Sequence, residues 1–342
     1  VNIVYTPLHG AGLVPTKRAL KEAGFTNVHI VNEQAIQDGD FPTVLYPNPE
    51  ETLAFQMGIA LGKEVEAELI LATDPDADRL GVATYNGEHY QLLSGNQLGA
   101  LLLNYILYTK QRAGTLPSNG AMLKTIVTSE LGTAIADSFN IQTINTLTGF
   151  KYIAEKMAEF ETTGEHSFLF GYEESYGYLA GNFVRDKDAV QIALLTAEMA
   201  SYYKEQNLTL LDVLNSLYQQ HGYYQEKLLS FTYEGIEGQK RIANIMEHFR
   251  NKRSIEIAGI KVRATEDYKA GFTYHANGEK QVLSLPKTDV IKYRLKDGSW
   301  ICIRPSGTEP KCKIYIGVRK DSVTEAFETI IDLEEYLQKM IN

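Results

Sequence analysis

Cysteine is scarce in this sequence of 342 residues, where Cys302 and Cys312 are the two examples. Two cysteines cannot build the disulfide framework that holds small secreted domains together. We therefore expect both thiols to be reduced and to pack on neighbouring strands, as in a cytosolic protein. Long apolar runs are missing too, because no stretch of the sequence reaches the length of a membrane span, and no signal peptide is expected from the residues given. The expected location is the cytoplasm.

An excess of positive charge is also lacking, since 33 lysines and arginines face 43 aspartates and glutamates and leave a net charge of −10. This balance argues against nucleic acid and anionic membranes as general partners. It remains compatible with a small anionic substrate if basic groups gather locally. The length predicts two or three domains. The chain starts at Val1, within an expected strand and without an initiator Met, which predicts a fragment of a longer polypeptide.

What the chain does have is a run of alternating aspartates, spelled Asp74-Pro75-Asp76-Ala77-Asp78-Arg79. The apolar run Leu69–Ala72 precedes it and predicts a buried strand that ends where this loop begins. Ligands of open α/β sheets bind at the carboxyl ends of strands. Asp74, Asp76 and Asp78 can aim oxygens at one point, which suits a hard cation such as Mg²⁺. Arg79 beside them favours a site where the cation and the guanidinium hold a phosphate together.

The aspartate run is open to two other interpretations. An EF-hand loop requires glycine at its sixth position and glutamate at its twelfth, and Arg79 and Tyr85 stand there instead. That interpretation therefore fails. An ordinary solvated acidic turn remains open on sequence grounds alone.

The rest of the chain alternates between expected strands and helices before the pattern changes to strands at Ile255. A hairpin is expected around Asn86-Gly87. The order of strand, turn, helix and strand after Ser94 resembles that of residues 1–31, which predicts a diverged structural repeat. The further expected segments are a helix over Gln97–Lys110 capped by Asn96, a strand over Leu123–Thr128, a connection over His221–Gly238, and a last helix over Val323–Met340.

Two more polar loops follow expected strands. In Gly171–Gly177, Glu173 and Ser175 lie on one side of an extended loop and could bond sugar hydroxyls, although an ordinary turn is the alternative. The loop Arg304–Lys311 combines an arginine fork, two hydroxyls, backbone donors and a lysine, which together predict a phosphate cradle. A plain polar hairpin loop is the alternative there.

Together these loops resemble the α-D-phosphohexomutase superfamily in their order and spacing. The Asp74–Arg79 loop is similar to its metal loop, Gly171–Gly177 to its sugar-recognition loop, and Arg304–Lys311 to its phosphate loop. The spellings Thr6–Gly10 and Thr148–Lys151 are similar to the longer bacterial members of phosphoglucomutase type. The resemblance covers essentially the whole chain.

The resemblance implies two consecutive α/β domains with mixed sheets flanked by helices, followed by a C-terminal α+β domain. Their expected limits are residues 1–92, 93–222 and 223–342, the last with its compact core from about residue 255. The family's first domain carries a phosphorylated serine in a Thr-x-Ser-His-Asn-Pro type segment, and no such segment occurs here. The chain is therefore expected to lack the serine domain and to be inactive alone.

The implied activity is an Mg²⁺-dependent interconversion of hexose 1-phosphate and hexose 6-phosphate, most directly of glucose, through a phosphoserine and glucose 1,6-bisphosphate. Phosphomannomutase, phosphopentomutase and a non-catalytic phosphosugar-binding or regulatory module are the alternatives. The expected partner is a phosphosugar, and the oligomeric state, a monomer among the options, stays open. The implied site residues are Asp74, Asp76 and Asp78 for the metal, Arg79 and Lys151 for catalysis, His9, Glu173, Ser175, Arg185, Arg304, Ser306, Gly307, Thr308 and Lys311 for substrate, and Lys187 as a further pocket residue.

One departure from the family pattern concerns the general acid and base. Short phosphomannomutase-type members carry a histidine shortly after the sugar-loop serine, where this chain has Tyr176-Gly177-Tyr178. The proton-transferring group is therefore unassigned. Lys151 is a candidate, because a lysine near other cations can have a lowered pKa.

Overall fold

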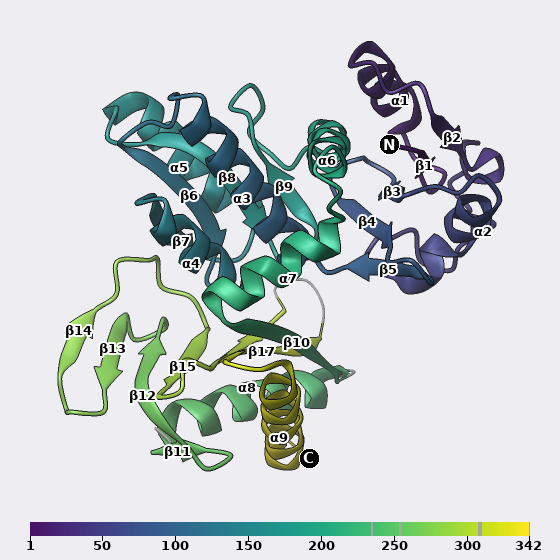
Figure 1. Ribbon diagram of the computed structural model, residues 1–342. Helices are drawn as coiled ribbons and strands as arrows, with labels where there is room; N and C mark the ends of the chain where they lie inside the picture. Colours follow the sequence, from purple (N-terminus) through teal and green to yellow (C-terminus); the bar gives the residue numbers. More distant parts are fainter. Residues whose placement is uncertain (234, 253–254, 307–309, 342) are drawn as a thin grey trace. The chain divides into compact units, whose positions relative to one another are not determined.

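The structure, a computed structural model, describes residues 1–233, 235–252, 255–306 and 310–341 (Figure 1). The chain divides into two compact units, Val1–Leu217 and Tyr218–Asn342. The first unit contains a five-stranded and a four-stranded sheet, and the second contains an eight-stranded sheet. The predicted fold class is confirmed: two α/β arrangements with mixed sheets precede a C-terminal α+β region. Among the helices of the described residues, none has the length and apolar character needed to cross a bilayer.

The first sheet has the strand order β2-β1-β3-β4-β5, in which β1 pairs in parallel with β2 and β3, and β4 pairs antiparallel with β3 and β5. Its elements are β1 (Ile3–Thr6), α1 (Leu13–Glu22), β2 (Val28–Ile30), η1 (Asn32–Gln34), η2 (Thr52–Phe55), α2 (Gln56–Glu64), β3 (Leu69–Thr73), β4 (Leu80–Tyr85) and β5 (Tyr90–Leu93). The apolar run that predicted a buried strand is β3, all of whose residues are buried. The aspartate loop starts directly at its carboxyl end.

The second sheet repeats this arrangement with the strand order β7-β6-β8-β9, again with two parallel pairs around its first strand and an antiparallel last strand. Its elements are α3 (Gly95–Arg112), β6 (Gly120–Thr125), α4 (Leu131–Ser138), β7 (Gln142–Thr146), α5 (Phe150–Thr163), β8 (Ser167–Glu173), β9 (Gly177–Leu179), α6 (Ala189–Lys204) and α7 (Leu210–His221). The predicted structural repeat is confirmed in this topology. The loops after β3 and β8 occupy equivalent places in the two sheets.

Two local predictions in this unit are wrong. Helix α3 is capped by Ser94 rather than Asn96: the Ser94 side chain accepts from the N–H of Gln97, and the Gln97 side chain accepts from the N–H of Ser94. Asn96 lies inside the helix, where its Oδ1 accepts from the N–H of Ser129. The strand predicted over Leu123–Thr128 is β6, which runs from Gly120 to Thr125. It ends at Thr125 because the hydroxyl of Thr125 accepts from the N–H of Val127 and starts a turn.

The second unit is built on one largely antiparallel sheet. Its elements are β10 (Tyr223–Thr232), α8 (Gly235–Lys252), β11 (Glu256–Ile257), β12 (Ile260–Asp267), β13 (Phe272–His275), β14 (Lys280–Val282), β15 (Ile291–Leu295), β16 (Trp300–Pro305), β17 (Lys311–Lys320) and α9 (Val323–Ile341). Strands β15 and β16 form an antiparallel hairpin within this sheet. The buried thiols of Cys302 and Cys312 lie on the neighbouring strands β16 and β17, as predicted.

The connection predicted over His221–Gly238 is wrong, because most of it is strand β10. This strand pairs antiparallel with β17 along its whole length, from Tyr223 opposite Lys320 to Thr232 opposite Lys311. Of its ten residues, Leu229 alone is buried, and apolar and polar residues do not alternate along the segment as they do in a core strand. Pairing with a distant strand stabilises it instead.

Candidate functional site

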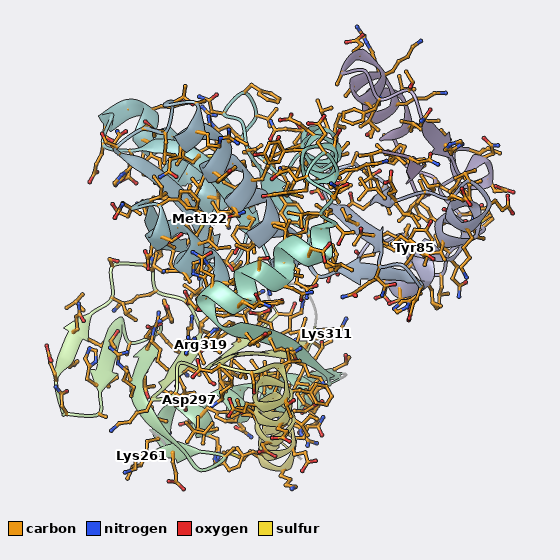
Figure 2. All side chains as sticks on the ribbon, in the orientation of Figure 1. Tyr85, Met122, Lys261, Asp297, Lys311 and Arg319 are labelled. Carbon is orange, nitrogen blue, oxygen red and sulfur yellow. The ribbon has the colours of Figure 1, made fainter. Side chains whose placement is uncertain are left out.

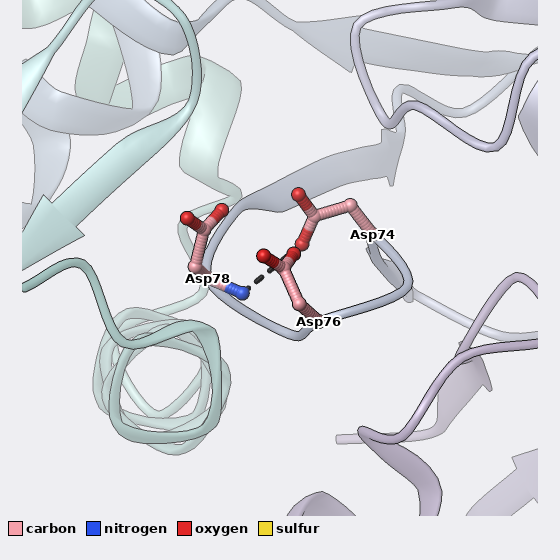
Figure 3. Close-up of side chains that lie close together, drawn as sticks. All are labelled: Asp74, Asp76 and Asp78. Atoms are coloured by element: carbon pink, nitrogen blue, oxygen red, sulfur yellow. Dashed lines mark hydrogen bonds between the residues drawn. The ribbon is translucent and has the colours of Figure 1, made fainter.

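The aspartate loop connects β3 to β4 and brings its three carboxylates together (Figure 3). Asp74, Asp76 and Asp78 each offer one oxygen, and these oxygens lie within 4.8 Å of one another. Asp74 is buried, with 8% of its surface exposed, while Asp78 is half-buried and Asp76 is exposed. The predicted convergence of the three side chains is therefore present in the fold.

Backbone donors fix one side of the Asp74 carboxylate. Its Oδ1 accepts from the N–H of Asp78 at 3.0 Å and from the N–H of Arg79 at 2.9 Å. Burial, together with the charges of Asp78 and Asp76, raises the pKa of Asp74 to about 7. Three carboxylates at this distance repel one another, and a cation among them would replace the repulsion with attraction.

Asp78 is held in a similar way by a side-chain donor. Lys187 Nζ lies 2.9 Å from Asp78 Oδ2, whereas Asp78 Oδ1 is buried and has no hydrogen-bond partner among the residues that the structure describes. A carboxylate oxygen that is buried without a partner is costly unless a further group binds it. Three converging carboxylates of this kind fit a hard divalent cation, which takes oxygen ligands.

Arg79 lies beside the same oxygens. Its Nε is 3.9 Å from Asp74 Oδ2 and 3.7 Å from Asp78 Oδ1. The other end of the guanidinium is bound elsewhere, because Nη1 donates to Glu50 Oε1 at 2.9 Å. Arg79 therefore lies beside the metal-binding carboxylates, as predicted. Its partner Glu50 is a residue that the sequence did not single out.

The predicted sugar loop is the tight turn between β8 and β9. Glu173, the last residue of β8, accepts from the N–H of Gly149 at 2.9 Å. Burial, with the charge of Glu174 as a further cause, raises the pKa of Glu173 to about 6. Ser175 lies in the middle of the turn and is half-buried.

The neighbouring Glu174 points into the protein and anchors the turn. Its Oε2 accepts from the hydroxyls of Thr125, the last residue of β6, at 3.3 Å and of Thr128, just beyond the strand, at 3.0 Å. The start of α3 also fits closely against the turn, since a Cβ added to Gly95 would lie 2.0 Å from the carbonyl oxygen of Glu174. These contacts fix the backbone that carries Glu173 and Ser175.

Backbone hydrogen bonds connect the aspartate loop directly to the sugar loop. The N–H of Leu80 donates to the carbonyl oxygen of Tyr176 at 3.0 Å, and Arg79 forms an isolated antiparallel bridge with Gly177. The stem of Lys187 covers Gly177 so closely that an added Cβ there would lie 2.2 Å from Lys187 Cδ. The fold therefore brings the two loops next to each other.

Three other predicted residues make contacts of a different kind. His9 is buried, and its ring nitrogens bond the carbonyl oxygen of Ile36 and the hydroxyl of Thr43 at 2.9 and 2.8 Å. Arg185 is exposed, donates to the carbonyl oxygen of Asn182 and pairs with Glu161. Lys151, in the first turn of α5, is exposed, and its ammonium lies 5.0 Å from the centre of the Tyr152 ring. These contacts do not join the three residues to the aspartate loop.

The predicted phosphate loop belongs to the second unit and connects β16 to β17. Arg304 is opposite Lys313 in the sheet, and the N–H of Ser306 donates to the carbonyl oxygen of Lys311 at 2.7 Å. Lys311, labelled in Figure 2, is the first residue of β17. Gly307 and Thr308, two further predicted phosphate ligands, lie outside the described residues.

Comparison with protein families assigns the chain to a class. The sequence matches three successive domains of phosphoglucomutase/phosphomannomutase: alpha/beta/alpha domain II over residues 1–87, alpha/beta/alpha domain III over residues 94–221, and the C-terminal domain over residues 259–333. The chain therefore belongs to the phosphoglucomutase/phosphomannomutase family of the α-D-phosphohexomutase superfamily. The resemblance that the three loops indicated is confirmed.

Individual proteins of this family are similar to the chain over most of its length. The phosphoglucomutase of Staphylococcus haemolyticus is 40% identical over 334 residues, which cover 96% of this chain and 59% of that protein. Among solved structures, Paramecium parafusin, described as a phosphoglucomutase, shares the fold with a TM-score of 0.65 and 18% identity over 99% of this chain and 57% of that one.

A further solved structure, the N-acetylphosphoglucosamine mutase of Aspergillus fumigatus in complex with GlcNAc-6P and magnesium, has a TM-score of 0.52 and 11% identity over 100% of this chain and 62% of that one. The present chain therefore spans about three-fifths of the length of these proteins.

Proposed function

We propose that this chain supplies the metal-binding, sugar-reading and phosphate-holding parts of a hexose-phosphate mutase, most directly a phosphoglucomutase. The activity would be an intramolecular phosphotransfer that interconverts glucose 1-phosphate and glucose 6-phosphate. The observation that carries the proposal is the pair of backbone contacts that join the aspartate loop to the turn containing Glu173 and Ser175. Relatives 40% identical to the chain and named phosphoglucomutase support the choice of sugar.

The metal proposed for this site is Mg²⁺, held by one oxygen each of Asp74, Asp76 and Asp78. The buried Oδ1 of Asp78, for which the described residues provide no hydrogen-bond donor, supports this assignment, as does the magnesium complex of the Aspergillus mutase. When bound, the cation would neutralise negative charge that develops on phosphoryl oxygens during transfer. Arg79, beside the same carboxylates, supplies a fixed positive charge for the same phosphoryl group.

Recognition of the sugar is assigned to the turn after β8. The Glu173 carboxylate accepts hydrogen bonds from hydroxyls, and the Ser175 hydroxyl can donate or accept. Because hydroxyls on both faces of a hexose offer the same chemistry, two such groups suit a sugar that binds in two orientations. A bisphosphate intermediate, glucose 1,6-bisphosphate, requires this reorientation before the second phosphate is transferred.

The phosphate that does not react is assigned to the loop after β16. Arg304, Ser306 and Lys311 would hold it together with Gly307 and Thr308, through a guanidinium fork, hydroxyls, backbone N–H groups and an ammonium. The serine that carries the phosphoryl group is assigned to a segment that this sequence does not contain. Lys151 remains the proposed general acid or base, Lys187 a pocket residue, and His9 and Arg185 peripheral substrate contacts. We assign the protein to the cytoplasm, where hexose phosphates are metabolised.

Steady-state kinetics of the complete polypeptide test this proposal. Glucose, mannose and ribose 1-phosphates are offered separately, with Mg²⁺ and glucose 1,6-bisphosphate as activator. The expected result is the highest kcat/KM for glucose 1-phosphate. A preference for mannose or ribose 1-phosphate would reassign the enzyme to phosphomannomutase or phosphopentomutase. No measurable activity with any of the three sugar phosphates would point to a phosphosugar-binding module instead.

A further inference from the structure

Arg79 occupies a position in which it could compete with a metal ion. Its Nε lies within 4 Å of Asp74 Oδ2 and Asp78 Oδ1. The opposite oxygens of these carboxylates are already taken, Asp74 Oδ1 by two backbone N–H groups and Asp78 Oδ2 by Lys187. The two oxygens nearest Arg79 are therefore the ones left for a metal.

Glu50 binds the far side of the guanidinium. Its Oε1 accepts from Arg79 Nη1 at 2.9 Å, and both side chains are about one-third exposed. The pair is thus shielded more than a surface ion pair, and the fork geometry of arginine gives it direction. The charge of Glu50 also acts on the sugar loop, where burial and then this charge raise the pKa of Tyr176 to about 12.

The segment that carries Glu50 is itself fixed. The N–H of Glu50 donates to the side-chain oxygen of Asn48 at 3.0 Å, which forms a local turn. Pro49 packs against β4 so tightly that a Cβ added to Gly81 would lie 2.7 Å from the Pro49 Cβ. Gly81 is two residues after Arg79, so the turn and the arginine are positioned against the same strand.

From this arrangement we propose that Glu50 is a positioning residue that holds Arg79 away from the metal-binding oxygens of Asp74 and Asp78. Without Glu50, the guanidinium has five donors and its nearest anions are the two carboxylates. It would then pair with them directly, and a divalent cation would have to displace it. The inference rests on the proposed metal site, and it names a residue of the segment before α2 that acts on that site through Arg79.

The test is Mg²⁺ binding to the 342-residue chain, measured by isothermal titration calorimetry without substrate. Glu50→Ala should weaken Mg²⁺ binding about tenfold, the lower end of the effect of losing a group that orients metal ligands. Glu50→Gln keeps an oxygen acceptor for Arg79 and should weaken binding less. Glu51→Ala is the matched control, because it removes the same charge from the adjacent position.

A double-mutant cycle separates positioning from a general charge effect. Arg79→Met should tighten Mg²⁺ binding, and in that background Glu50→Ala should weaken it no more than Glu51→Ala does. A loss that persists in the Arg79→Met background would overturn the inference, as would equal effects of Glu50→Ala and Glu51→Ala in the parent chain. If the parent chain binds no Mg²⁺, the proposed metal site fails, and the role of Glu50 fails with it. Unfolding curves of each variant identify changes that come from damage to the fold.

Discussion

The burial of the Glu173 carboxyl group leads to a quantitative prediction about how the stability of the fold depends on pH. Burial raises its pKa from 4.5 to about 6, so the folded protein binds the proton more tightly than the unfolded chain does. The stabilisation is fully present below about pH 4.5 and is lost as the pH rises through about 6. A shift of this size corresponds to about 2 kcal/mol, and residual contact with water reduces it to roughly 1–2 kcal/mol.

Glu173→Gln imitates the protonated group, because the amide oxygen can still accept from the N–H of Gly149. The variant should therefore be more stable than the parent chain by roughly 1–2 kcal/mol above about pH 7, with no difference below about pH 4.5. Urea unfolding followed by far-UV circular dichroism measures this difference. The single tryptophan, Trp300, lies in the second unit, so its fluorescence follows that unit separately.

Glu155→Gln is the matched control, since it removes the same charge from an exposed position of α5. A Glu173→Gln variant that is less stable than the parent at neutral pH would refute the argument. So would a stability difference that is equal at both pH values. The first result would mean that the ionised carboxylate is stabilised in the fold despite its burial beside Glu174, and the second that folding leaves the proton affinity of Glu173 unchanged.

Three further predictions concern the loops. Asp76→Asn should weaken Mg²⁺ binding and lower kcat in the complete enzyme, and an unchanged Mg²⁺ dependence would remove Asp76 from the site. Arg304→Ala should mainly raise KM, because a group that holds the phosphate throughout binds substrate and transition state alike; a large loss of kcat with constant KM would contradict that role. Gly10→Ala should destabilise the fold by about 1–3 kcal/mol, since its Cβ would lie 2.3 Å from the Pro75 Cα, while Gly39→Ala, with open space around it, should change stability little. Equal stabilities of these two glycine variants, measured by urea unfolding, would contradict the close packing under the aspartate loop.

The sequence was sufficient to predict those parts of the fold that depend on local patterns. The run Leu69–Ala72 is apolar throughout and is the buried strand β3, and the alternating aspartates after it do converge. Strand β10 could not be predicted in this way, because its pairing partner, β17, is about ninety residues away and its own pattern is mixed. Element types thus followed from periodicity, whereas pairing between distant strands did not.

The same distinction applies to the candidate site. Asp74, Asp76 and Asp78 are close in the sequence, so their convergence follows from one loop. The charged partners of this loop come from other elements: Lys187, which pairs with Asp78, precedes α6, and Glu50, which pairs with Arg79, lies in a proline-rich segment before α2. A lone glutamate in such a segment has no distinguishing pattern. Its role in binding Arg79 is visible only after the chain has folded.

We propose, as the central point of this account, that the chain contains the metal, sugar and phosphate loops of a phosphoglucomutase whose phosphoryl-carrying serine is absent from this sequence. The most direct measurement follows glucose 1-phosphate by phosphorus NMR with Mg²⁺ and glucose 1,6-bisphosphate, using the complete polypeptide and the 342-residue chain in parallel. The account predicts conversion to glucose 6-phosphate by the complete polypeptide and none by the chain alone. Turnover by the chain alone, or no conversion by the complete polypeptide, would contradict it.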